Sequence, residues 1–378
     1  MNADKTLSCI TAYLHRNISK DVLEALKEVK VGDIHLSSAR SLVIEEKKGL
    51  LAMLPGRDLA QDPLDIVFFL VKPGMEDPLV SLIIEKGHLY YPGRGSVLVE
   101  EVELIDQHEL FGDHDIQPFE RPAQPVHLYP CVGICCIMKR GQGDKVARIA
   151  LDTGTCVPAV HFGTGTGVRD KMGLLRITIP PEKEIIHAFP TFHEADHIME
   201  MMIEAGRLDQ PGSGFIYSFP VKKGLVNTKV NRGEQSHAAS IEQIVTALDH
   251  MKGNTEWRRR RTVVEKRSAR KKKYLRGLVD MVLLCDGGTG MDLARAAMSA
   301  GAEGATISGT QHIRPPDSPD PALRHIPPAR DVCSMVIPEE TKEAVTNALA
   351  EAGAFSDRCH GRIHWRRTSK AFTYVVQH

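Results

Sequence analysis

The letters H-E-A-D-H, from His193 to His197, have the spacing that can build a zinc site on a helix. On a helix, His193 and His197 would share one face and bind the metal, and Glu194 would be the general base of a hydrolase. The alternative is an exposed helix start, where Glu194 and Asp196 complement the helix dipole. No third ligand is specified, although His187 is close in sequence. We favour the helix start, expect no metal and no catalytic residue, and keep the zinc hydrolase as an alternative.

Two glycine-rich stretches could do a different kind of chemistry, the binding of phosphate by backbone N–H groups. Neither has the residue order of a Walker A loop or of a dinucleotide-binding fingerprint. The first is equally compatible with a flexible hairpin loop, and the second with a tight turn from helix to strand. The candidate nucleotide-binding residues are Gly163, Thr164, Gly165, Thr166, Gly167 and Arg169 in the first stretch, and Gln210, Gly212, Ser213, Gly214 and Phe215 in the second.

A third candidate is the basic stretch from Trp257 to Arg276, which holds eleven Lys and Arg residues. It could bind RNA, an acidic partner or anionic lipid. Aromatic residues are found only near its edges, at Trp257 and Tyr274, which argues against a platform for stacking bases. The whole chain balances 48 Lys and Arg against 48 Asp and Glu, so its net charge gives no sign of DNA binding. We interpret residues 253–271 as a solvated basic linker.

Composition sets the class of protein. The 378 residues are 42% hydrophobic and 25% charged, the balance of a globular protein with two or three domains. No apolar run reaches the ~18 residues of a membrane helix, and the first residues do not resemble a secretory leader, so we expect a cytoplasmic protein. The eight cysteines include no C-x-x-C pair, and several lie in apolar runs, so we expect free buried thiols.

The elements that must position these residues occur in an internal repeat. Residues 134–216 match residues 281–363 at one constant shift and without a gap, which places Gly141 on Gly288 and Gly143 on Gly290. A more divergent copy precedes them. The predicted domains are repeat one at 1–110, repeat two at 122–252 with a C-terminal extension, the basic linker at 253–271 and repeat three at 272–378.

Each copy has the hydrophobic pattern of strand, helix, strand, strand, helix and strand. In the second copy, residues 144–152 and 193–205 are predicted to be helices, and the latter end near a glycine, a common stop signal. This order is that of the ferredoxin-like βαββαβ unit, an α+β fold in which helices cover one face of a sheet. The other face needs a partner. Two sibling copies could supply it within one chain, as an intramolecular pseudo-trimer. The alternative is a row of separate domains in which copy two forms trimers between chains.

Copy two contains the stretches GTGTG, LLRITIPPEKEII, EAGRLDQPGSGFIYSFPV and NRGEQSHA. Together they resemble the PII nitrogen-regulatory and PII-like signalling family, whose members are trimers of ferredoxin-like subunits with adenine nucleotides in the clefts between subunits. The resemblance implies that residues 163–167 form the T-loop base, that residues 210–215 form the B-loop, and that Lys229 and Arg232 belong to a cationic C-terminal segment. The related positions in the other copies are Gly93, Arg94 and Gly95 in copy one, and Thr310, Gly361 and Arg362 in copy three.

Departures from the family pattern affect the expected ligand. A B-loop Lys that contacts phosphate in family members is replaced by Phe215 in copy two and Ser96 in copy one, and only copy three has a cation, Arg362. The T-loop tyrosine that some members have modified has no clear counterpart. We expect a regulatory protein that binds AMP, ADP, ATP or a cyclic adenine nucleotide and controls a membrane transporter or an enzyme through its T-loops. A ligand-free structural pseudo-trimer is the remaining alternative.

Overall fold

The computed structural model describes residues 5–45, 58–105, 128–166, 182–228, 231–232, 272–314 and 325–375. Along these residues, the order strand, helix, strand, strand, helix, strand occurs three times. We name the three parts unit one (5–105), unit two (128–232) and unit three (272–375). The predicted basic linker at 253–271 lies outside the described residues.

The elements of the three units have the following bounds. Unit one contains β1 (Lys5–His15), α1 (Arg16–Glu28), β2 (Ile34–Glu45), β3 (Asp58–Val71), α2 (Glu76–Gly87) and β4 (Gly95–Ile105). Unit two contains β5 (Tyr129–Lys139), α3 (Gly143–Asp152), β6 (Ala159–Gly165), β7 (Glu182–Ala188), α4 (Ala195–Gly206), β8 (Gly214–Leu225) and β9 (Asn231–Arg232). Unit three contains β10 (Leu278–Asp286), α7 (Gly290–Ser299), β11 (Thr306–Ile313), β12 (Ala329–Pro338), a 3-10 turn (Glu339–Thr341), α9 (Lys342–Glu351), β13 (Arg362–Arg367) and β14 (Lys370–Thr373).

The fourteen strands of the described residues belong to one sheet. Within each unit, four of them are antiparallel neighbours, in the order β4-β1-β3-β2, β8-β5-β7-β6 and β13-β10-β12-β11. The described residues also form six α-helices, and this large antiparallel sheet with its helices confirms the predicted α+β class.

The three units are joined by the pairing of their last strands. The end of β4 pairs with the start of β13, with Ile105 opposite Ile363. The end of β8 pairs with the start of β4, with Leu225 opposite Val97. β14 completes the ring, because it pairs with the start of β8. In the middle, β2, β6 and β11 pair with one another, so each unit contacts the other two at both edges of its own strands.

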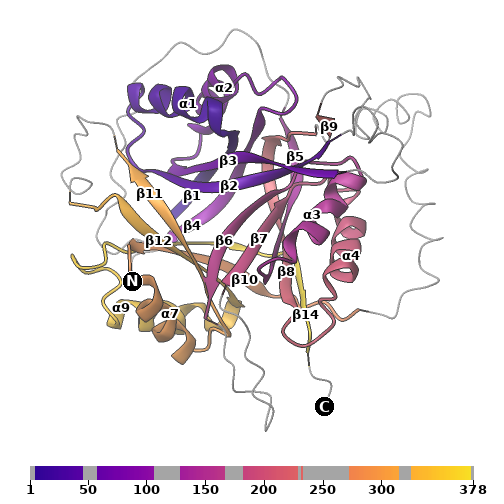
Figure 1. The fold of residues 1–378 in the computed structure, drawn as a ribbon. Coiled ribbons are helices and arrows are strands. Elements are labelled where there is room, and N and C mark those ends of the chain that lie inside the picture. Colours follow the sequence, from indigo (N-terminus) through magenta and orange to yellow (C-terminus); the bar gives the residue numbers. More distant parts are fainter. Residues whose placement is uncertain are drawn as a thin grey trace, which may run out of the picture.

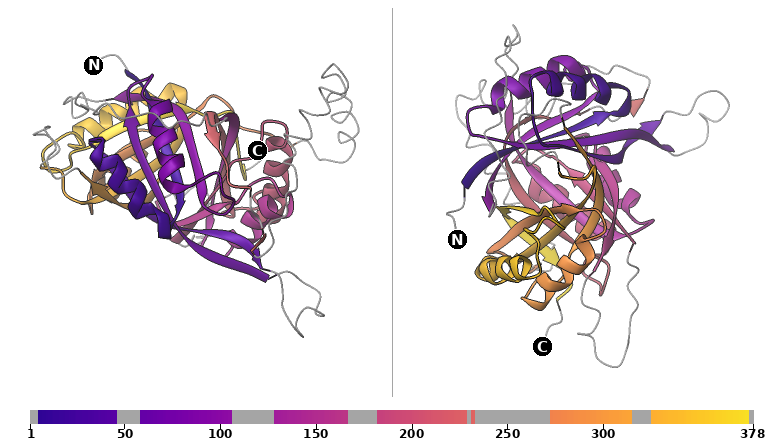
Figure 2. Two further views of the ribbon diagram at one scale, coloured as in Figure 1. Left: turned by 90° about the horizontal axis from the view of Figure 1, so that it is seen from above. Right: turned by 90° about the vertical axis from the view of Figure 1, so that its left-hand side faces the viewer.

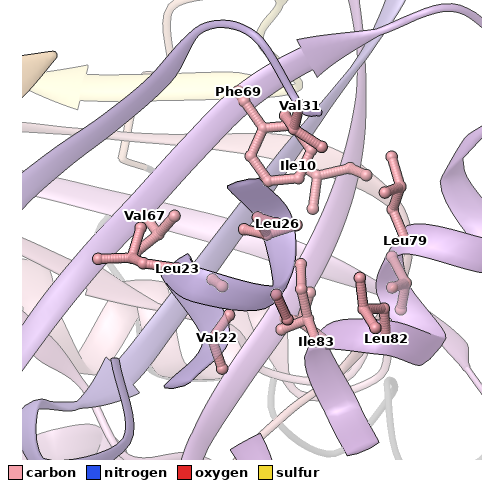
Figure 3. Close-up of a cluster of buried hydrophobic side chains, with 14 of the residues drawn as sticks. Ile10, Val22, Leu23, Leu26, Val31, Val67, Phe69, Leu79, Leu82 and Ile83 are labelled. Carbon is pink, nitrogen blue, oxygen red and sulfur yellow. The ribbon is translucent and has the colours of Figure 1, made fainter. Parts of the chain in front are cut away.

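The helices lie on the outside of the molecule in three pairs, and the strands lie between them (Figure 1, Figure 2). On α1, Ile18, Val22 and Leu26 recur at helical spacing and are buried, so this helix turns one apolar face toward the sheet. They pack there with Leu79 of α2 and Phe69 of β3, and the close-up in Figure 3 shows this cluster. No helix in the described ranges is long and apolar enough to cross a membrane.

A glycine is required where the last strand begins in units one and two. Gly95 and Gly214 have φ values of +152° and +154°, which other residues rarely adopt. A side chain at either position would also collide with a carbonyl oxygen, that of Tyr13 in unit one and that of Ile137 in unit two. The same positive φ and the same close approach of a carbonyl oxygen occur in both turns, which explains why the sequence repeats this glycine.

A buried acid holds the start of the first helix in unit two. Glu184 is 3% exposed and accepts hydrogen bonds from the N–H groups of Gly141 (2.9 Å) and Gly143 (2.7 Å). Its other oxygen accepts from Arg40 of unit one at 2.9 Å. Asp331 bonds in the same way to the two glycines that the repeat aligns in unit three. The matched glycines therefore mark N–H groups at a helix start that need an acceptor.

Replacing Glu184 by Ala should lower the free energy of unfolding by about 3 kcal/mol, because two N–H groups, one of them buried, and a guanidinium lose an acceptor. The matched control is Glu182→Ala, since Glu182 is largely exposed and lies 3.5 Å from the exposed Arg140. It should change stability by less than about 0.5 kcal/mol. Urea unfolding followed by circular dichroism measures both variants, and equal losses would contradict the role assigned to Glu184.

Candidate functional site

The first glycine-rich stretch is not a free loop where the structure describes it. Gly163 to Gly165 form the end of β6, with β7 on one side and β11 of unit three on the other. This corrects the expected loop, because sheet pairing on both edges uses backbone groups that a phosphate would need. Thr166 follows, and its N–H and hydroxyl both donate to the carbonyl of Ala305 in unit three (2.9 and 3.2 Å). Outside the described residues are Gly167, Arg169 and Lys229, whereas Arg232 is described by its backbone, in β9 beside β2.

The second stretch does form a turn, between α4 and β8. The N–H of Ser213 donates to the carbonyl of Gln210 at 3.2 Å, and Gly212 between them has a φ of +67°. Gln210 is exposed at the surface of this turn. The stretch therefore forms the tight turn from helix to strand that the sequence also allows.

Both stretches of unit two face unit three, but they lie apart. β14 covers the end of the second stretch, because Thr373 pairs with Phe215 and its hydroxyl donates to the carbonyl of Gly214 (2.8 Å). Strands β5 and β7 lie between β8 and β6, so the two stretches are about 14 Å apart across the sheet. A ligand that touched both would have to extend over two strand ends.

In unit one, the related turn meets unit two. The N–H of Gly93 donates to the side chain of Asn227 (3.0 Å), and the N–H of Asn227 donates to the hydroxyl of Ser96 (2.8 Å). Arg94 is exposed beside this contact, and Gly95 begins β4. The turn of unit one therefore lies at a seam between units, as does the turn of unit two.

The seam between units three and one, which we call the third seam, contains buried charged and aromatic side chains. Arg362 at the start of β13 is 3% exposed, and its guanidinium forms an ion pair with Asp33 of unit one. The Nε2 atoms of His35 and His312 lie 3.2 and 3.0 Å from Oδ1 of the same carboxylate. Thr310 is buried on β11 of unit three. Two of the predicted residues, Thr310 and Arg362, therefore lie in one polar region that unit one completes.

A second ion pair lies within unit three, close to the first. Arg330 is 2% exposed, pairs with Asp286 and donates to the carbonyl of His360 (2.7 Å). The Nδ1 atom of His360 lies 2.8 Å from the other oxygen of Asp286. Gly361 comes next, and its N–H donates to the carbonyl of Ala354 (2.7 Å). These contacts hold the predicted residues Gly361 and Arg362 in place from the unit-three side.

Burial sets the protonation of the third seam. It lowers the pKa of His312 to about 4, with a further contribution from Arg330. It also lowers the pKa of His35 well below its ordinary value. The pKa of Arg362 falls to about 10, again through burial, and remains well above neutral pH. Near pH 7 both histidines are therefore neutral, and each of the two arginines is matched by one carboxylate.

Several buried donors of the third seam have no hydrogen-bond partner among the residues that the structure describes. They are Nε and Nη1 of Arg362, Nε of Arg330 and Oγ1 of Thr310. An unsatisfied buried donor costs about 1–3 kcal/mol, so a ligand that brings acceptor oxygens would recover this loss. The seam is therefore suited to a ligand with phosphate or carbonyl oxygens and a small total charge.

The H-E-A-D-H stretch does not form the face of two histidines that the zinc alternative requires. α4 begins at Ala195, so His193 and Glu194 precede the helix that contains His197. Glu194 accepts a hydrogen bond from the hydroxyl of Thr191 (2.9 Å) in the turn before the helix. Within the described ranges, no group of three or more His, Cys, Asp or Glu side chains is placed to hold a metal ion. All eight cysteines are buried free thiols, as the sequence predicts.

Sequence reasoning missed Asp33, His35, His312 and Arg330, which supply much of the polar character of the third seam. A polar residue next to or inside an apolar strand is the signal that could have found them, because such groups are buried with partners. The partners come from different units, and no local pattern connects them.

Comparisons of the chain with protein-family models and with curated proteins found no match.

Replacing Asp33 by Asn should lower the free energy of unfolding by about 3 kcal/mol, because the Arg362 guanidinium stays buried without its carboxylate. Adding Arg362→Met should regain at least half of this loss, since the uncompensated charge is removed. The control is Asp21→Asn on the exposed side of α1, with a change under about 0.5 kcal/mol. Urea unfolding measures all three variants. A double variant less stable than the single one would contradict the assigned ion pair.

Proposed function

We propose that the three units are ferredoxin-like repeats that pack as a pseudo-trimer within one chain. The support is the strand order, which is the same in all three units, and the ring that their last strands form. The same turn glycine at Gly95 and Gly214 adds to it. Joining three copies in one chain raises their effective concentration to the millimolar range, which favours docking within the chain.

On this basis, the protein is a cytoplasmic signal-transduction protein of the PII-like class, and its ligand is an adenine nucleotide. The observation that carries the proposal is the position of the candidate residues at the seams. Gly93 of unit one contacts unit two, Gly214 of unit two contacts unit three, and Arg362 of unit three contacts unit one. The resemblance places nucleotides between subunits, and these seams are the corresponding places in a single chain.

The third seam favours a nucleotide of low charge. Its two arginines are each paired with a carboxylate, so several phosphate charges would be buried without compensation. AMP or a cyclic nucleotide brings fewer charges than ATP. The spare N–H groups of Arg362 and the hydroxyl of Thr310 would donate to its phosphate oxygens.

Nucleotide binding would affect a partner protein by changing the conformation of the strands that pair in the middle of the molecule. β2, β6 and β11 pair with one another, and Gln311 next to His312 of the third seam pairs with Leu36 of β2. A nucleotide that binds one arrangement of these strands more tightly than another would shift their populations. The segments that follow the three strands are the counterparts of T-loops and would carry this state to a regulated transporter or enzyme.

Calorimetric titration with AMP, ADP, ATP and cyclic AMP tests the proposal. We expect saturable binding of at least one of them, with AMP or the cyclic form binding more tightly than ATP. A folded protein that binds none of the four at millimolar concentration would contradict the nucleotide sensor. That result would leave a ligand-free scaffold.

Replacing Thr310 by Val separates binding from stability. The change should weaken nucleotide binding about tenfold, the effect of one hydrogen bond to phosphate. It should not destabilise the protein, because the hydroxyl has no partner in the described part of the chain. The control is Thr346→Val on α9, whose hydroxyl donates to the carbonyl of Lys342 (2.9 Å). That variant should lose about 1 kcal/mol of stability and keep its nucleotide affinity.

A further inference from the structure

The inner faces of the three units form a cavity with a mostly apolar wall at the place where the units meet. Its volume is about 130 Å³, and side chains from all three units line it. Unit one contributes Tyr13 and Glu100, unit two contributes Tyr217, and unit three contributes Asp280 and Arg366. We call it the central cavity. The donors assigned to the nucleotide at the third seam, on Arg362, Arg330 and Thr310, do not line it, so a ligand here would be independent of the proposed function.

One guanidinium in the central cavity serves two carboxylates. Arg366 donates to Oδ2 of Asp280 through Nε (3.0 Å) and Nη2 (2.7 Å), and its Nη1 forms an ion pair with Glu100. The hydroxyl of Tyr217 donates to the same Asp280 oxygen at 3.1 Å. When Asp280 and Glu100 are both ionised, these two acids and Arg366 together have a net charge of −1. Burying a net charge costs free energy unless a proton or a cation balances it.

Three buried polar atoms of residues that line the central cavity lack a hydrogen-bond partner within the described ranges. They are Oδ1 of Asp280, which is 1% exposed, Nδ1 of His364, which is 7% exposed, and Nε2 of His161. A carboxylate oxygen accepts hydrogen bonds, and a neutral imidazole nitrogen can also accept one. The cavity wall also includes the hydroxyl-bearing residues Thr11, Ser37 and Ser334. The cavity therefore offers several hydrogen-bond acceptors within a mostly apolar wall.

The other titratable groups around Asp280 do not supply the missing positive charge. Burial lowers the pKa of His161 to about 4 and that of His187 and of His364 to about 3, so these rings are neutral near pH 7. Burial raises the pKa of the thiols and phenols that line the cavity, namely Cys9, Cys135, Tyr13 and Tyr217, and keeps them neutral as well.

Asp280 itself can take up a proton in place of a cation. Burial raises its pKa from the ordinary 3.8 to about 7. Because the raised pKa belongs to the folded state, the proton stabilises the fold at low pH. That contribution is lost as the pH rises from about 4 through about 7. Above this range the carboxylate is ionised and its excess charge is open to another cation.

We propose that the central cavity binds a small ammonium group, either the ammonium ion or a primary amine in its charged form, in exchange for the proton of Asp280. The N–H groups of such a ligand would donate to Oδ1 of Asp280, to Nδ1 of His364 and to the wall hydroxyls. The proton leaves to solvent, so each cation bound to the protonated form releases one proton.

Size and donor chemistry select this class of ligand. A cavity of ~150 Å³ can hold a molecule as large as benzene, so the central cavity has room for ammonium, methylammonium or a slightly larger amine. The described residues contain no cluster of three or more His, Cys, Asp or Glu side chains suited to a metal ion. An ammonium group differs from a metal ion in that it forms directed hydrogen bonds to a few acceptors.

Calorimetry on the unmodified protein tests the proposal, with methylammonium chloride as ligand and tetramethylammonium chloride as the matched cation without N–H groups. We expect saturable binding of methylammonium and none of tetramethylammonium. The affinity should rise about tenfold between about pH 6 and about pH 8, because the ionised fraction of Asp280 rises tenfold. Titrations in buffers with different ionisation enthalpies should show release of nearly one proton per cation at about pH 6 and almost none at about pH 8.

The variant Asp280→Asn should lose methylammonium binding and its proton release. Asp292→Asn, an exposed acid on α7 of the same unit, should keep both. If Asp280→Asn does not fold, the unmodified protein still decides the question. No saturable binding of methylammonium, equal binding of tetramethylammonium, or an affinity that does not change with pH would each overturn the proposal.

Discussion

The structure depends on the pairing of each unit's last strand with that of the next. β4, β8, β13 and β14 together close a ring that ties all three units at one edge of their strands. An unpaired strand edge invites pairing with other chains, and an uncovered sheet face exposes apolar surface. The ring removes both problems at once. It also produces the seams and the central cavity, which exist only where units face one another.

A single chain can place different residues at related positions, and the polar chemistry of this protein uses that freedom. Glu100, Phe219 and Arg366 each come five residues after the glycine at the start of the last strand. Arg366 forms an ion pair with Glu100 and lies over the ring of Phe219, with 3.5 Å from its Cζ atom to the ring centroid. Three identical chains would bring three equal residues together here. In the same way, Ser96, Phe215 and Arg362 give three chemically different seams.

The sequence predicted the elements of each unit well, because their causes are local. The spacing of Ile18, Val22 and Leu26 defines one helix face, and the turn at Gly214 follows from its backbone conformation. The contacts between units, in contrast, could be expected only from the resemblance to a trimeric family. The glycine-rich pattern at Gly163 favours a loop, but this segment forms the end of β6. The sequence near Gly163 does not reveal this, because the pairing strand β11 belongs to another unit. The pairing of Arg362 with Asp33 also joins distant parts of the chain, which no spacing rule detects.

The most direct test of the account asks whether the units close within one chain. The ion pairs that cross between units include Lys223 with Asp77 and Lys370 with Asp196, and a zero-length carbodiimide reagent can convert each of these two into an amide. Chains with natural nitrogen and chains with heavy nitrogen are mixed in denaturant, refolded together and cross-linked, and the joined peptides are weighed by mass spectrometry. Units that close within one chain give joined peptides that are wholly light or wholly heavy. Peptides with one light and one heavy partner would contradict closure within one chain, because the units would then pair between chains.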